Sequence, residues 1–126
     1  MATPKISSHR DLLVWQKAMD FAVETYRLAG QLPASETYRL GSQITRAAAS
    51  VPANIAEGYA RATKKDYANF LAIAKGSLME TETLLTLAAR LGFVEPQETA
   101  SAADLITEIS KMLTVLRQRI LLAAKL

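Results

Sequence analysis

Four long segments with helical hydrophobic spacing, separated by short turn sequences, are the feature that most constrains this chain. They are expected at about residues 9–29, 35–61, 64–91 and 97–124. Apolar residues recur three and four positions apart in each segment, as on one face of a helix, and no segment alternates like a strand. Short turns between helices of similar length favour antiparallel neighbours. The sequence therefore predicts an all-α, up-down-up-down antiparallel four-helix bundle that forms a single domain over residues 1–126.

Turn and capping residues mark the ends of these segments. Ser8 followed by Asp11 resembles a capping box at the start of the first helix, and the sequence GQLP at residues 30–33 ends that helix. Ser35 is expected to cap the second helix. Gly92 lies where a C-terminal cap is expected after the third helix.

The first segment is apolar over more than one face. Its main stripe comprises Leu12, Trp15, Met19, Ala22, Val23 and Tyr26. Val14, Phe21 and Leu28 lie off this stripe. Two interpretations of them are open: they contact another subunit, or the face toward the core is wide. The stripe of the third segment comprises Tyr67, Phe70, Leu71, Ala74, Leu78, Leu85 and Ala88, and that of the fourth comprises Leu105, Ile106, Ile109, Met112, Leu113, Leu116 and Ile120.

The second segment contains Pro52 in its middle. Because proline has no amide hydrogen, the carbonyl of Ala48 would lose its helical hydrogen bond, at about 3 kcal/mol in an isolated helix. Either Ser50 caps a new helix with Pro52 in its first turn, or one kinked helix continues. We expect the continuous helix, because the helical periodicity keeps its phase across the proline.

The second segment also carries a polar stripe beside a stripe of small residues. The polar stripe comprises Arg39, Gln43, Arg46, Ser50, Asn54, Glu57 and Arg61. The small stripe, which would let another helix approach closely, comprises Ser42, Thr45, Ala49, Ala53, Ala56 and Ala60. Three interpretations of the polar stripe are open: a solvated face, a satisfied hydrogen-bond network inside the bundle or between subunits, or a ligand surface.

Two residues of the third segment extend the candidate network. Glu80 lies at the edge of the apolar stripe, and Ser77 lies one turn before it. We expect Glu80 to be partly buried and paired with Arg46 of the antiparallel neighbour. The candidate structural network therefore comprises Arg46, Ser50, Asn54, Glu57, Ser77 and Glu80.

Residues that could support catalysis or bind a metal are scarce. His9 is the only histidine, and the chain has no cysteine. His9 is expected at an exposed helix start beside Arg10 and Asp11, so we do not expect a histidine-based triad. The sequence contains none of the Glu-x-x-His pairs of a di-iron bundle. The five glycines are isolated and form no phosphate-binding loop. We expect no enzymatic activity, no metal and no cofactor.

The bulk composition suits a small cytoplasmic protein. Half of the residues are hydrophobic, no stretch approaches the roughly 20 apolar residues of a membrane span, and the lack of cysteine fits a reducing compartment. The net charge of +3 arises from 15 basic and 12 acidic residues. It is spread along the chain, with +1 in each of residues 1–34, 35–63 and 64–94 and zero in residues 95–126. No basic block of the kind found in dedicated nucleic-acid binders stands out.

Four basic residues are the candidates for nucleic-acid binding: Arg39, Arg61, Lys64 and Lys65. Phosphate binding needs several converging charges, so one copy offers a modest patch that an oligomer would repeat. The alternative is that Arg39 and Arg46 pair with acidic residues of the bundle. An acid-free run of four basic residues ends the fourth segment and suits the negative helix terminus; it comprises Lys111, Arg117, Arg119 and Lys125.

Three stretches of the sequence carry a family resemblance: LLVWQKA, YRLGSQITRAAASVPANIAEGYAR and FLAIAKGSLMETETLL. Over residues 9–94, and more loosely in the fourth segment, they resemble the four-helix-bundle family of 23S rRNA intervening-sequence proteins. The resemblance implies a left-handed up-down bundle, a ring-like homopentamer and no established enzymatic activity. A similar bundle is an accessory protein to the reverse transcriptase of diversity-generating retroelements, where it engages nucleic acid. Val51-Pro52 departs from the Ser-Ile or Ser-Val pair that family members often carry.

These features predict a non-enzymatic, homo-oligomeric scaffold or accessory protein. It would bind nucleic acid, ribosomal RNA or DNA, or an enzyme that acts on nucleic acid, and it would have no contact with a membrane. The alternative is a protein–protein adaptor that binds no nucleic acid and uses the apolar surface of the first segment.

Overall fold

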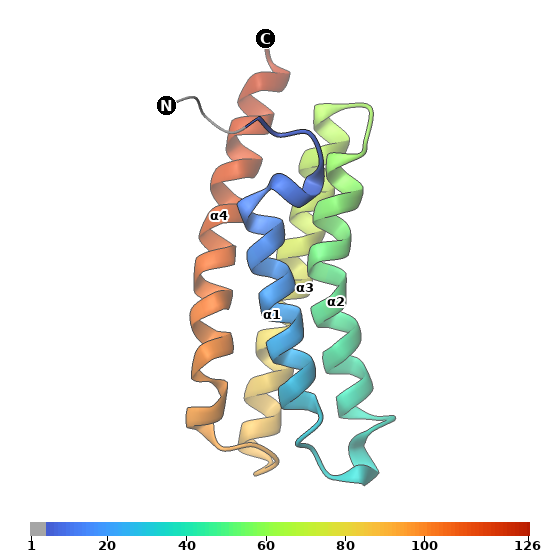
Figure 1. Cartoon of the computed structure of the whole chain (residues 1–126), viewed down its shortest axis with the longest axis vertical. Coiled ribbons are helices and arrows are strands. Elements are labelled where there is room, and N and C mark those ends of the chain that lie inside the picture. Colours follow the sequence, from blue (N-terminus) through green and yellow to red (C-terminus); the bar gives the residue numbers. More distant parts are fainter. Residues whose placement is uncertain (1–4) are drawn as a thin grey trace.

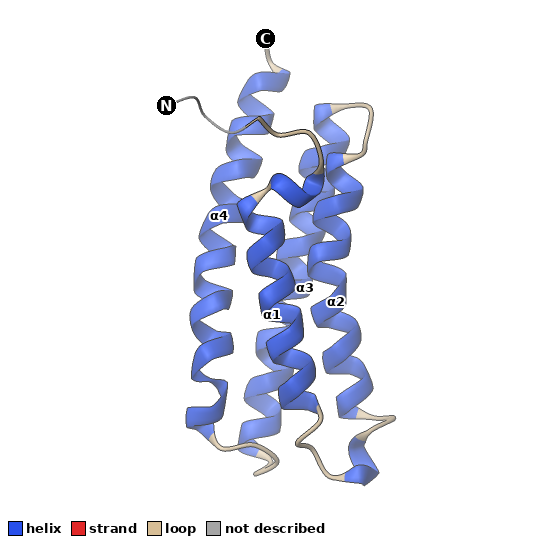
Figure 2. Cartoon of the chain, in the orientation of Figure 1, coloured by secondary structure: helices blue, strands red, loops and turns tan. Residues whose placement is uncertain are grey.

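The computed structural model describes residues 5–126, which form four long α-helices joined by short connections (Figure 1). The helices are α1 (Leu13–Ala29), α2 (Leu40–Tyr59), α3 (Lys64–Arg90) and α4 (Ala100–Ala124). The described residues contain no strand (Figure 2). The predicted all-α fold with four helices is therefore confirmed. Residues 1–4 of the domain expected over residues 1–126 lie outside the described part of the chain.

Successive helices run in opposite directions: α1 and α3 descend in Figure 1, and α2 and α4 ascend. Each helix packs against its neighbours in sequence, and α1 also packs against α4. The α2–α3 turn and the last turns of α4 consequently lie together at one end of the bundle, here called the upper end. The α1–α2 and α3–α4 connections lie at the opposite, lower end.

Three of the expected helix starts are short 3-10 helices that precede the α-helices: η1 (His9–Asp11), η2 (Ala34–Glu36) and η3 (Pro96–Thr99). The predicted capping box of Ser8 and Asp11 is present, but it caps η1. Leu12 then adopts an extended conformation, so α1 begins at Leu13. At the end of α3, Gly92 has a φ of 80° and provides the predicted left-handed turn.

Pro52 lies inside α2, which is continuous from Leu40 to Tyr59. The expected continuous helix is therefore confirmed, and the break with a new cap at Ser50 is not formed. The proline ring is buried, and burial of apolar surface offsets part of the hydrogen bond that the carbonyl of Ala48 loses.

The buried residues recur at alternating spacings of three and four, as in left-handed bundles whose side chains interdigitate. In α4 they are Ala102, Ile106, Ile109 and Leu113, with Leu105, Met112, Leu116 and Ile120 partly buried against them. In α3 the buried set includes Leu71, Ala74, Leu78, Leu85 and Ala88. The stripes predicted for these two segments therefore face the core, except that Tyr67 and Phe70 are only half-buried at its edge.

The face of α1 that packs into the core differs from the predicted main stripe. Val14, Phe21 and Leu28, which lay off that stripe, are buried in the core. Among residues of the predicted stripe, Met19 is 40% exposed and Val23 is 68% exposed. The interpretation of the three off-stripe residues as a subunit contact is therefore wrong. The exposed apolar residues of α1, which include Met19 and Val23, lie on the side of the helix that faces away from the core.

Two small or hydroxylated residues explain this error. The core face of α1 includes Ala18 and Thr25, both completely buried, and a threonine weakens an apolar pattern. The Thr25 hydroxyl donates a 2.8 Å hydrogen bond to the carbonyl of Phe21 in its own helix. Buried Thr81 of α3 makes the same 2.8 Å bond to the carbonyl of Ser77. A threonine satisfied in this way is compatible with the core, although sequence patterns count it as polar.

Gly58 allows α2 and α3 to approach closely near the upper end. A Cβ atom at this position would lie 2.8 Å from Cβ of Phe70 and 3.2 Å from the carbonyl oxygen of Tyr67. Neither is the free end of a flexible side chain, so the two helices would have to separate. Gly76, in the middle of α3, differs because a Cβ atom there would meet no atom within 4 Å.

We predict that Gly58→Ala lowers the free energy of unfolding by about 1–3 kcal/mol, because it overpacks the α2–α3 contact. Gly76→Ala is the matched control and should raise stability by roughly 0.5–1 kcal/mol, since alanine favours a helix where there is room. Urea denaturation followed by circular dichroism measures both. Equal stability of the two variants would contradict the close packing at Gly58.

Candidate nucleic-acid interface

Three residues of the predicted polar network meet between α2 and α3. The hydroxyl oxygens of Ser50 and Ser77 lie 2.8 Å apart, and Nδ2 of Asn54 donates to the Ser50 hydroxyl at 2.8 Å. Nδ2 of Asn54 also lies 2.8 Å from the Ser50 carbonyl oxygen. All three residues are half-buried. The polar stripe of α2 therefore contains a hydrogen-bonded centre that joins two helices, which sequence spacing indicated correctly.

Arg46 and Glu80 line one hollow of about 280 Å³ next to this centre. Both residues are exposed, and no ion pair within 4.0 Å joins them among the pairs of residues 5–126. The expectation of a partly buried Glu80 paired with Arg46 is therefore wrong. Glu80 lies far enough around α3 for its carboxylate to reach water, where it needs no partner.

Glu57 and Arg61 pair with each other instead of joining the network. Nη2 of Arg61 lies 2.9 Å from Oε1 of Glu57, one turn earlier on α2. The Arg61 guanidinium also lies 4.4 Å from the ring centre of Phe70, which is a cation–π distance. Arg61 thereby remains positioned at the α2–α3 turn, where Lys64 and Lys65 are both exposed.

Arg39 is separated from the other three basic candidates. It lies directly before α2 at the lower end and forms a 3.6 Å ion pair with Glu36. Arg61, Lys64 and Lys65 lie at the upper end, beyond the whole length of α2. A 20-residue helix is about 30 Å long. The four predicted residues therefore do not form one surface, and only the last three lie together.

The fold sorts the charges of the chain by end. Residues 5–11, 57–75 and 111–126 make up the upper part, as the antiparallel arrangement in Figure 1 shows. They contain ten basic and three acidic residues, a net charge of +7. The remaining part contains five basic and nine acidic residues, a net charge of −4. The excess that looks evenly spread along the sequence is therefore concentrated at one end.

Beyond Arg61, Lys64 and Lys65, seven further basic residues belong to this upper end: Lys5, Arg10, Lys75, Lys111, Arg117, Arg119 and Lys125. The last four form the acid-free run that ends the chain, and their position in the sequence alone does not place them beside the α2–α3 turn. The predicted topology contained the necessary information, because antiparallel helices bring the end of α2, the start of α3 and the end of α4 together.

Hydrogen bonds and burial shift the pKa values of two groups at the upper end, Asp11 and Tyr67. Backbone and side-chain hydrogen bonds from Ser7, with a further bond from Ser8, lower the pKa of Asp11, so its carboxylate is charged at neutral pH. Burial, together with nearby Tyr59, raises the pKa of the Tyr67 hydroxyl. Tyr67 therefore stays neutral and adds no negative charge beside Lys64.

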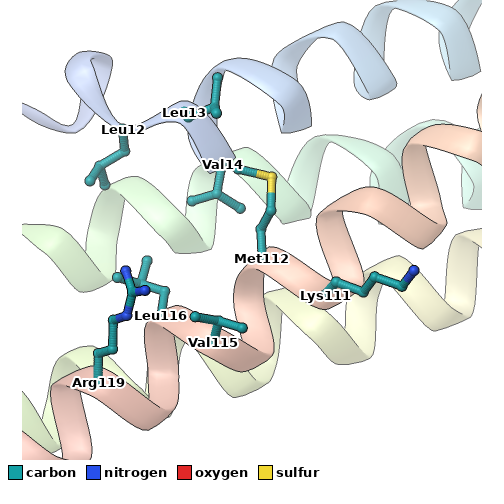
Figure 3. Close-up of a pocket in the computed structure, with 8 residues that line it drawn as sticks. All are labelled: Leu12, Leu13, Val14, Lys111, Met112, Val115, Leu116 and Arg119. Carbon is teal, nitrogen blue, oxygen red and sulfur yellow. The ribbon is translucent and has the colours of Figure 1, made fainter.

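A hollow of about 440 Å³ lies between α1 and α4 in the upper part. Its lining is apolar apart from two cations and comprises Leu12, Leu13, Val14, Lys111, Met112, Val115, Leu116 and Arg119. Met112 reaches from α4 toward Val14 of α1, and Lys111 extends away from the apolar side chains (Figure 3). Apart from its two cations, this hollow offers few polar groups to a charged ligand.

Residues 5–126 contain no cluster of three or more His, Asp or Glu side chains that could hold a metal ion. None of the described helices is both long and apolar enough to cross a membrane.

Comparisons with known proteins agree with this architecture. The family model described as 23S rRNA-intervening sequence protein matches residues 10–115. The chain is also similar to a solved structure from Bacteroides thetaiotaomicron, a protein with unknown function from the S23 ribosomal protein family. The two are 30% identical with a TM-score of 0.77, and the match covers 83% of this chain and 98% of the other. A search of curated proteins found no match.

We predict that Ser50→Ala lowers the free energy of unfolding by about 1 kcal/mol, because it leaves Asn54 and Ser77 without their shared partner. The loss in the Ser50→Ala/Ser77→Ala double variant should be smaller than the sum of the two single losses, since neighbouring partners couple. Arg46→Ala is the control and should change stability by less than about 0.5 kcal/mol. Additive losses in a urea double-mutant cycle would contradict the hydrogen-bonded centre.

Proposed function

Because the chain belongs to the 23S rRNA-intervening sequence protein family, we propose that it is a non-enzymatic, homo-oligomeric scaffold or accessory protein that binds nucleic acid. Ribosomal RNA is the first candidate, as the family's description contains it, and binding it would place the protein in the cytoplasm. DNA would present the same polyanionic backbone, and an enzyme that acts on nucleic acid is a further candidate partner. The family's description and that of the related structure name no catalytic activity.

The net charge of +7 at the upper end is the observation that carries this proposal. Exposed Lys64 and Lys65 lie at its tip, and Arg61 is positioned beside them by Phe70. Phosphate contacts supply most of the sequence-independent affinity for nucleic acid. We therefore assign nucleic-acid binding to Arg61, Lys64 and Lys65 and leave out Arg39, which lies at the lower end.

Self-association would repeat this basic end and multiply its phosphate contacts. The exposed apolar side chains of α1 support it: Met19, Val23 and Tyr26, of which Val23 is 68% exposed. Beside them, a groove of about 400 Å³ between α1 and α2 is lined by Trp15 and Met19 and by three alanines of the small stripe. We propose that a second copy packs here, because small residues permit close approach of helices. We propose a homopentamer, and this number of subunits comes from the family resemblance alone.

The alternative function is a protein–protein adaptor that binds no nucleic acid. The same exposed surface of α1 favours it, since an apolar helix face suits a protein partner. Nucleic-acid binding separates the two functions: an adaptor would bind neither RNA nor DNA, even at low salt.

We predict that Lys64→Glu/Lys65→Glu weakens binding to all RNA and DNA sequences alike and lowers the salt slope of log affinity by at least about 1.4, because each lysine contributes about one phosphate contact and each contact with a single strand contributes about 0.7 to the slope. Fluorescence anisotropy with labelled single strands from low to moderate salt measures both quantities. Arg46→Glu/Arg90→Glu removes the same charge from exposed positions in the lower part and should leave the slope unchanged. Unchanged affinity in the lysine variant would rule out the proposed surface.

We predict that the wild type self-associates at micromolar concentration and that Val23→Glu shifts it toward monomer, because the buried carboxylate would lack a partner. Multi-angle light scattering measures the mass, and circular dichroism confirms that the helices remain. Leu122→Glu changes a residue of similar exposure, 63%, on α4 and should leave the mass unchanged. A monomeric wild type would refute self-association.

A further inference from the structure

A second hollow, of about 420 Å³, lies between α3 and α4 in the upper part. Two cations line it: Lys75 from α3 and Arg117 from α4. Both are half-buried, unlike the exposed Lys64 and Lys65. Thr114 and Gln118 of α4 contribute a hydroxyl and an amide to the same lining, and no acidic residue belongs to it.

Each of the two cations is held by one neutral acceptor. Nζ of Lys75 donates to Oγ1 of Thr114 at 2.8 Å, and Nε of Arg117 donates to the carbonyl of Ala68 at 3.2 Å. Neither has a carboxylate within 4.0 Å among residues 5–126. An ammonium group has three N–H donors and a guanidinium group has five, so most of their donors remain available. Two half-buried like charges in one hollow are a strong attractor for an anion.

Gly76 keeps the α3 side of the hollow open. A Cβ atom at this position would meet no atom within 4 Å, and Gly76 belongs to the lining. The hollow is far larger than the roughly 30 Å³ that one water molecule occupies in the liquid. It therefore has room for a polyatomic anion between the two cations.

We propose that this α3–α4 groove is a binding site for a phosphate group. A phosphate carries up to two negative charges and several acceptor oxygens, which matches Lys75 and Arg117 together with the neutral amide donors of Gln118; the Thr114 hydroxyl donates to the carbonyl of Ser110 and holds Lys75 in place. A carboxylate offers only one charge and two oxygens, so it would leave more of the hydrogen-bond donors in the groove without a partner. The site does not depend on the proposed function, because a small phosphorylated molecule and a nucleic-acid backbone supply the same group.

Isothermal titration with inorganic pyrophosphate at constant ionic strength tests the site. We expect saturable binding that Lys75→Met/Arg117→Met weakens by at least about tenfold, which corresponds to about 1.4 kcal/mol. Lys111→Met/Arg119→Met removes the same charge from the apolar α1–α4 hollow of Figure 3, and should change the affinity by less than about twofold. Succinate, a dicarboxylate, should bind the wild type more weakly than pyrophosphate.

Gly76→Leu tests the groove while both cations remain. The leucine side chain would fill the hollow, so we expect loss of pyrophosphate binding with an unchanged circular dichroism spectrum. A parallel loss of single-stranded RNA binding assigns the phosphate to a nucleic-acid backbone, whereas unchanged RNA binding assigns it to a small phosphorylated molecule.

Three results would overturn the phosphate site: no saturable pyrophosphate binding by the wild type, equal losses in the two Met pairs, or full binding by Gly76→Leu. Failure of the Lys64/Lys65 test alone would remove the nucleic-acid proposal and leave this site intact.

Discussion

The close approach of α2 and α3 decides how the upper end of this bundle is built. At Gly58 the two backbones are too near for any side chain, and one turn away the Arg61 guanidinium lies over the ring of Phe70. Further down, the Ser50 and Ser77 hydroxyls meet at 2.8 Å. These contacts fix the α2–α3 turn and hold Lys64 and Lys65 at its tip. The surface of Arg61, Lys64 and Lys65 that we propose to bind nucleic acid therefore depends on the close α2–α3 contact behind it.

The number of helices and most of their core faces could be predicted from the sequence, because long periodic segments with clear turn residues leave little choice. The faces of α3 and α4 were predicted well, since large aliphatic residues dominate them. The face of α1 was not, because Ala18 and Thr25 occupy core positions while larger side chains such as Met19 remain outside. The start of α3 at Lys64 was predicted correctly, whereas the other three helix starts were misplaced, since residues such as Ser8 can cap a 3-10 turn as well as an α-helix.

The candidate site was predicted only in part. Spacing along α2 was enough to place Ser50 and Asn54 on one side, and antiparallel packing brought Ser77 to them. Spacing cannot tell whether a carboxylate such as Glu80 reaches water or turns inward, because that depends on a few degrees of helix rotation. Nor does a running sum of charge along the sequence show where Lys75 and Arg117 meet. Their juxtaposition belongs to the α3–α4 contact and is visible only in the folded chain.

The separation of charge gives the folded chain a permanent electric dipole moment along its long axis. The four helix macrodipoles contribute little to it, because antiparallel neighbours cancel; ionised side chains produce it, with +7 toward one end and −4 toward the other. The 27-residue α3 is about 40 Å long, which exceeds the Debye length of about 8–10 Å at physiological salt. The two ends are therefore screened from each other, and a polyanion nearby feels mainly the end it approaches. When the protein approaches a polyanion side-on, the field of the polyanion exerts a torque that turns the cationic end of the protein toward it before contact. Electrostatic forces therefore select the orientation of the encounter, and short-range contacts then complete the binding.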